Sequence, residues 1–231
     1  WASLYSRKNR KYSMKKIIDG KINPKEYDNA KCKILWILKE ANISTEDKEK
    51  EIDVCEGFRN DWHKKNALSI PTFRKLIYAT YGILNPNVEW ENVPYANQEA
   101  YEVIKQIAYI NINKFPADSS SNDLEIKKAY NEGKNDLLKQ IKDLNPNVII
   151  FGNTLKYFED EDLAEINWNI STTEKKYADN NTFNTAFYII SPNKLCVNAY
   201  HPSYPKITDK TYWKEIRNAF IFWESNKKHI K

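Results

Sequence analysis

The sequence is most informative at Cys196-Val197-Asn198-Ala199-Tyr200-His201-Pro202-Ser203-Tyr204-Pro205, where an apolar strand ends in a histidine between a tyrosine and a proline. Proline fixes φ near about −65° and biases the preceding residue toward extended geometry, so residues 200–203 should form a defined loop. A histidine in such a loop can turn its ring into a pocket at the end of a sheet. It can equally be a turn residue whose ring nitrogens are satisfied locally.

Three other segments share this pattern of an apolar strand followed by a polar, loop-prone end: residues 33–38, 108–113 and 148–151. Near-continuous apolar runs that alternate with helix-like sequence indicate parallel strands buried on both faces. Ligands bind such sheets outside the carboxyl ends of the strands. The sequence therefore predicts one site formed by Glu40, Asn111, Asn153 and His201.

These observations predict an α/β protein: a three-layer α/β/α domain with a central four-stranded parallel sheet. We expect residues 1–231 to form a single domain, because 231 residues with 41% hydrophobic content can fill one sizeable core. We also expect a basic N-terminal segment at about residues 1–30 and a surface insertion at about residues 159–184. The insertion is acidic and then rich in Asn and Thr.

Composition narrows the function classes. No apolar run reaches membrane-spanning length, the first residues do not resemble a signal or transit peptide, and three unpaired-looking cysteines fit a reducing cytoplasm. The net charge of +5 supports nucleic-acid binding weakly, although six basic residues fall within residues 7–16. That segment is either a phosphate-binding element or a solvated terminus.

From about Lys31 to Trp223 the chain resembles the uracil-DNA glycosylase superfamily. Tyr200-His201-Pro202-Ser203 looks like its second motif, and residues 145–154 are similar to its third strand and the glycine turn that follows. Residues 109–114 look like the strand whose asparagine reads a pyrimidine edge, with Asn111 fitting that register better than Asn113. The resemblance implies base flipping and hydrolysis of the N-glycosidic bond of uracil or another modified base in DNA.

The resemblance also implies roles for individual residues. Glu40 would stabilise positive charge on the sugar and orient water, and His201 would donate to the departing base. The predicted base-binding residues are Asn111, Ala41 and an aromatic residue that stacks on the base, for which we choose Phe58 over Trp62. The predicted DNA-binding residues are Pro202, Ser203, Asn153 and Lys206.

The first motif departs from the family pattern. Relatives carry a Gly-Glu-Ala-Pro-Gly type loop, whereas this chain has Lys39-Glu40-Ala41-Asn42-Ile43, so only Glu40 and Ala41 match. Loss of glycine and proline implies a reshaped pocket floor and allows a base other than uracil. Some relatives hold an iron-sulfur cluster, but Cys32, Cys55 and Cys196 have no Cys-x-x-Cys spacing, so we predict no cluster, no metal and no cofactor.

Other function classes stay open. The same pocket could serve a noncatalytic nucleotide- or nucleic-acid-binding module, or a nucleoside or nucleotide hydrolase. A serine hydrolase built on Ser203 is disfavoured, because the chain has no Gly-x-Ser-x-Gly elbow. A Rossmann dinucleotide enzyme is disfavoured because no Gly-x-Gly-x-x-Gly follows the first strand. We expect a monomer whose partner is DNA, in duplex or single-stranded form.

Overall fold

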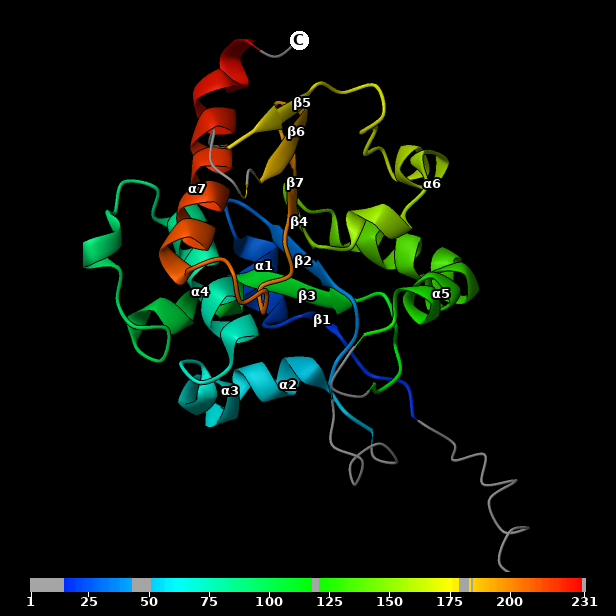
Figure 1. Ribbon diagram of the computed structural model, residues 1–231, viewed down its shortest axis with the longest axis horizontal. Helices are drawn as coiled ribbons and strands as arrows, with labels where there is room; N and C mark the ends of the chain where they lie inside the picture. Colours follow the sequence, from blue (N-terminus) through cyan, green and yellow to red (C-terminus); the bar gives the residue numbers. More distant parts are fainter. Residues whose placement is uncertain (1–14, 43–50, 118–120, 179–182, 184, 230–231) are drawn as a thin grey trace, which may run out of the picture.

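The computed structural model describes residues 15–42, 51–117, 121–178, 183 and 185–229 (Figure 1). These residues build one seven-stranded sheet in the order β1-β3-β2-β4-β7-β6-β5. The strands are, in chain order, β1 Gly20–Lys21, β2 Ile34–Leu38, β3 Ile107–Asn111, β4 Val148–Gly152, β5 Lys175–Tyr177, β6 Ala186–Ser191 and β7 Lys194–Ala199.

All four predicted strands are present, as β2, β3, β4 and β7. β2 pairs in parallel with β3 and with β4, and β4 pairs in parallel with β7. The remaining strands pair antiparallel, β1 with β3 and β6 with both β7 and β5. The sheet is therefore mixed and larger than the four-stranded parallel sheet that we predicted. The sequence analysis missed the hairpin in which Pro192-Asn193 turns β6 back into β7.

Helices cover both faces of the sheet. The α-helices are α1 Pro24–Asn29, α2 Val54–Arg59, α3 Asp61–Asn66, α4 Pro71–Leu84, α5 Asp123–Leu144, α6 Asp160–Glu165 and α7 Asp209–Asn226. Short 3-10 helices lie at Trp90–Asn92, Glu99–Gln106, Leu155–Tyr157 and Lys227–His229. Figure 1 shows α4 and α7 on one side of the sheet and α5 and α6 on the other.

The alternation of side chains along each strand produces these two packed faces. In β2, Ile34, Trp36 and Leu38 join the apolar cluster that contains residues of α4 and α7. Leu35 and Ile37 point to the opposite face and join the cluster formed with α5 and α6. Because every residue of β2 is buried, the strand reads as a continuous apolar run, as expected for a strand covered on both faces.

The segment that we predicted as a surface insertion also contributes to the core. It contains α6 and β5, and Trp168 between them is 2% exposed within the cluster on the α5 face. Its Asn/Thr-rich part lies largely outside the described residues, as do Arg7, Lys8, Arg10 and Lys11 of the basic N-terminal segment. Of the helices that the structure describes, none has the length and apolar character to cross a membrane.

Candidate functional site

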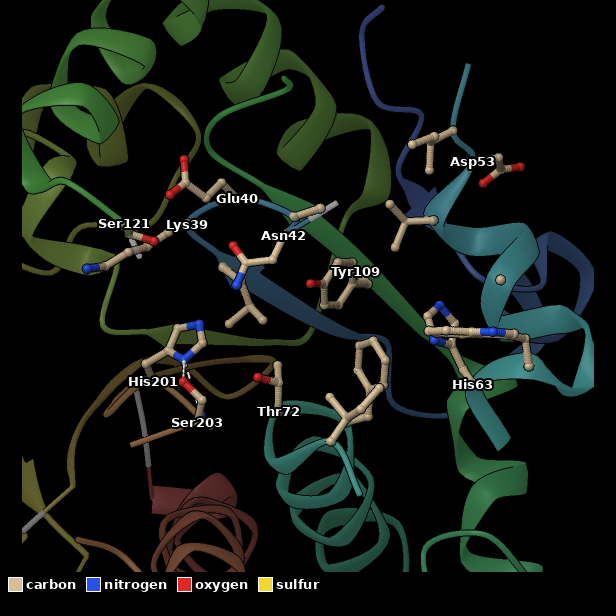
Figure 2. Close-up of a pocket in the computed structure, with 18 of the residues that line it drawn as sticks. Lys39, Glu40, Asn42, Asp53, His63, Thr72, Tyr109, Ser121, His201 and Ser203 are labelled. Atoms are coloured by element: carbon tan, nitrogen blue, oxygen red, sulfur yellow. Dashed lines mark hydrogen bonds between the residues drawn. The ribbon is translucent and has the colours of Figure 1, made fainter. Parts of the chain in front are cut away.

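A cavity of about 850 Å³ lies at the carboxyl ends of the parallel strands (Figure 2). Glu40, Ala41, His201 and Ser203 from our predicted set line it. The wall also includes residues that the sequence analysis did not assign to a site: Asn42, His63, Thr72, Phe73, Tyr109 and Tyr204. The predicted convergence of the strand ends thus brings Glu40 and His201 to one cavity.

The loop that carries His201 is a tight turn. The backbone N–H of Tyr204 donates to the carbonyl of His201 at 2.8 Å. The backbone N–H of Ser203 donates to Nδ1 of His201 at 3.2 Å, and the Ser203 hydroxyl lies 2.8 Å from the same nitrogen. Because a backbone N–H can only donate, Nδ1 is an acceptor and the neutral ring carries its proton on Nε2. Figure 2 shows the ring edge opposite Ser203 turned toward the cavity.

Two buried side chains, one from α4 and one from α7, hold this loop in place. The ammonium group of Lys75 on α4 donates to the carbonyl of Tyr204 at 2.7 Å, and the Tyr212 hydroxyl on α7 donates to the carbonyl of Tyr200 at 2.9 Å. The rings of Tyr200 and Tyr204 stack at a centroid separation of 5.0 Å. His201 is therefore held in place before any ligand arrives.

The environment of His201 keeps its ring neutral. Burial lowers the pKa of His201 to about 4, and the positive charges of Lys39 and Lys75 add to this effect. The Lys39 ammonium does not extend freely into solvent, since it donates to Asp123 at 2.8 Å. At neutral pH the cavity therefore contains a neutral imidazole with an Nε2–H donor.

Gly152, at the end of β4, allows the His201 loop to pack closely. A Cβ atom there would lie 2.3 Å from Cδ2 of Leu38 and 3.2 Å from Cδ of Pro202. Pro202 is buried against this position. The prediction that Pro202 contacts DNA is therefore not supported by its placement.

Two further predicted DNA-binding residues lie away from the cavity lining. Asn153 has a left-handed backbone with φ 61° and donates its N–H to the carbonyl of Ala199 at 2.8 Å, so its visible role is to terminate β4. Lys206 is exposed beyond the His201 turn. Neither residue belongs to the cavity wall.

Glu40 is held at the cavity wall by Asn113. The Asn113 amide donates from Nδ2 to Oε2 of Glu40 at 3.1 Å. In the view of Figure 2, Glu40 and His201 lie on opposite sides of Asn42. Both residues therefore border the same cavity.

Asn111 is buried and is not part of the cavity lining. It is 0% exposed, and its backbone N–H donates to Asp19, whose carboxylate also accepts from Lys114 at 2.7 Å. Neither polar atom of the Asn111 amide has a hydrogen-bond partner within the described residues. The amide lies close enough to the Tyr109 phenol to favour its ionised form, but burial has the larger effect and raises the pKa of Tyr109.

Phe58, the residue that we predicted to stack on a base, does not line the cavity. Phe58 is 2% exposed and packs against His63, Phe73 and Tyr109 with ring centroids 4.3, 5.1 and 5.4 Å away. Trp62, which is 56% exposed, and Phe73 line the cavity instead. Phe73 lies in the first turn of α4, which begins at Pro71, and no local feature of the sequence indicates that this helix begins at the cavity.

His63 forms a second buried imidazole in the cavity wall. It is 8% exposed among aromatic rings, and its Nδ1 has no hydrogen-bond partner in the described part of the chain. Burial lowers the pKa of His63 to about 4. Its ring is therefore neutral across the physiological pH range.

The described residues contain no group of three or more His, Cys, Asp or Glu side chains that could hold a metal ion. Cys32, Cys55 and Cys196 are free thiols. Comparisons with family models, with curated proteins and with solved structures found no match to this chain.

Proposed function

We propose that this protein is a DNA glycosylase that hydrolyses the N-glycosidic bond of uracil or another modified base. The observation that carries the proposal is the joint placement of a carboxylate, Glu40, and a neutral imidazole, His201, on one cavity at the carboxyl ends of parallel strands. The resemblance in sequence motifs supports the same function. We also propose that the fold is a three-layer α/β/α domain related to that of the uracil-DNA glycosylase superfamily.

The two groups suit the charges that develop when the bond breaks. Negative charge appears on the departing base. The neutral His201 ring already carries its proton on Nε2, so this N–H can donate a hydrogen bond to a base oxygen. Positive charge appears on the sugar, where the Glu40 carboxylate would stabilise it and orient the attacking water. The flipped base would lie along the aromatic wall formed by Phe73 and Tyr109.

The buried amide of Asn111 supports a role in base recognition. It lies within reach of the phenol of Tyr109, a residue that lines the cavity. A pyrimidine edge offers both donors and acceptors to such an amide. Because Asn111 is covered in this structure, recognition requires a side-chain movement that opens it to the cavity.

One contact favours a second candidate, a serine hydrolase. The Ser203 hydroxyl lies 2.8 Å from Nδ1 of His201, which is the separation expected for a nucleophile and its base. However, the Ser203 backbone N–H occupies the same nitrogen, and no described residue bonds Nε2 to orient the ring. The contact is better explained as a local turn that sets the tautomer.

The test is incubation of the full chain with single- and double-stranded oligonucleotides, each carrying one modified base. Abasic sites are revealed by strand cleavage in hot alkali. We expect release from at least one substrate, a loss of about 100-fold or more in His201→Ala, and slower release with retained binding in Glu40→Gln. If the protein binds these oligonucleotides but forms no abasic sites in them, the result would instead support a noncatalytic nucleic-acid-binding module.

A further inference from the structure

Asn113 lies two residues beyond the end of β3, and its side chain contacts another residue of the site. Beyond β3, Ile112 N–H donates to the Leu38 carbonyl at 2.9 Å and Asn113 N–H donates to the Lys39 carbonyl at 2.8 Å. These bonds hold the segment that follows β3 against the segment that follows β2. They place Asn113 beside Glu40.

The orientation of the Asn113 amide is fixed by its own turn. The backbone N–H of Phe115 donates to Oδ1 of Asn113 at 3.1 Å. Since that N–H can only donate, the amide cannot be reversed, and its Nδ2 is left to donate to Oε2 of Glu40 at 3.1 Å. No other described residue forms a hydrogen bond with the Glu40 carboxylate.

The neighbouring lysines pair with carboxylates other than that of Glu40. Lys39, the residue before Glu40, donates to Asp123, and Lys156 pairs with the same carboxylate. Lys114, the residue after Asn113, is bound to Asp19. Among the described residues, Glu40 is thus held by a neutral donor, which adds no charge to the cavity.

We propose that Asn113 is a positioning residue that holds the Glu40 carboxylate in a fixed orientation at the cavity wall. A catalytic effect of Asn113 rests on the proposed function, but its effect on the Glu40 carboxylate can be measured without any activity. Among the described residues, the other titratable or charged groups around Glu40 and the cavity are Lys39, Glu51, Asp53, His63, Tyr109, Asp123, Lys156, Tyr157, His201 and Tyr204.

The decisive variant is Asn113→Asp. Its carboxylate can still accept from Phe115 N–H, but it replaces the donor facing Glu40 with a second negative charge. Two carboxylates that share a site cannot both ionise easily, so the pair should retain a proton to higher pH. We expect the titration midpoint of the Glu40 carboxyl, followed by carbon-13 NMR and assigned from its absence in Glu40→Gln, to rise by about one pH unit or more.

The chain offers a matched control in Asn23. Its Oδ1 accepts from the Glu26 backbone N–H at 3.2 Å, and its Nδ2 lies 3.4 Å from Oε1 of Glu26. The same change, Asn23→Asp, therefore reproduces the local chemistry at α1, outside the cavity wall. It should leave both the Glu40 titration and base release as in the parent.

Base release gives the second measurement. In Asn113→Asp the acid limb of the pH–rate profile should shift to higher pH by about one unit, together with the Glu40 titration. In the Glu40→Gln background, the same substitution should leave the acid limb where it is. A folded Asn113→Asp protein with an unchanged Glu40 titration overturns the inference. Absence of base release from every substrate, with a shifted titration, rejects the proposed function and leaves the positioning of Glu40 intact.

Discussion

Replacing Ser203 by alanine separates the two enzyme classes that the His201 loop could serve. As a glycosylase, the protein uses Ser203 to keep Nδ1 of His201 as an acceptor and does not need its hydroxyl as a nucleophile. The backbone N–H of Ser203 performs that task at 3.2 Å and is retained in Ser203→Ala. As a serine hydrolase, the protein would need the hydroxyl itself, and the substitution would remove the nucleophile.

The structure sets the size of the expected effect. Ser203→Ala removes one of two contacts to Nδ1, and a single such hydrogen bond contributes about 0.5–1.5 kcal/mol. If the whole of that energy is lost in the transition state, base release slows by roughly 2- to 13-fold. His201→Ala removes the donor to the departing base and should cost about 100-fold or more.

The assay is single-turnover base release from the preferred oligonucleotide, measured for the parent, Ser203→Ala and His201→Ala. Ser225→Ala is a suitable control, because Ser225 is an exposed serine on α7 whose hydroxyl donates to the Ile221 carbonyl at 2.9 Å. The control should match the parent. A folded Ser203→Ala protein that is as inactive as His201→Ala would refute the assignment of Ser203 as a turn residue and favour a nucleophilic serine.

Three further predictions concern stability and recognition. Gly152→Ala should lower the free energy of unfolding, measured in urea, by about 1–3 kcal/mol, because the new Cβ would overlap the buried Leu38 side chain. Gly133→Ala is the control: a Cβ there meets nothing within 4 Å, so the free energy of unfolding should not fall. His63 has its pKa lowered to about 4, so the unfolded chain binds more protons between about pH 4 and 6.5 and stability falls as pH decreases through this range. His63→Phe should therefore reduce the stability difference between pH 7 and pH 5 by about 2 kcal/mol, and an undiminished difference would mean that His63 is not the group responsible. Asn111→Asp should shift the preference among modified bases, because a carboxylate only accepts hydrogen bonds; an unchanged ranking would remove Asn111 from base recognition.

The sequence by itself determined the four central strands and the edge of the sheet where their polar ends meet. Those segments are apolar at almost every position, and this pattern requires burial on both faces whatever lies around them. His201 and Glu40 follow two of these strands directly, so their joint placement required only that the strands run parallel. Proline at position 202 likewise made the histidine loop predictable, because its constraint acts on adjacent residues.

Only the tertiary structure decided what fills the site. An aromatic residue has the same local pattern whether it lines a cavity or supports one, so Phe58 could not be distinguished from Phe73 until α2 and α4 were packed. The burial of Asn111 depends on Asp19, 92 residues earlier in the chain, and on neighbours that no spacing reveals. Contacts between distant segments, rather than local propensity, therefore fix which polar groups are exposed, paired or left without a partner.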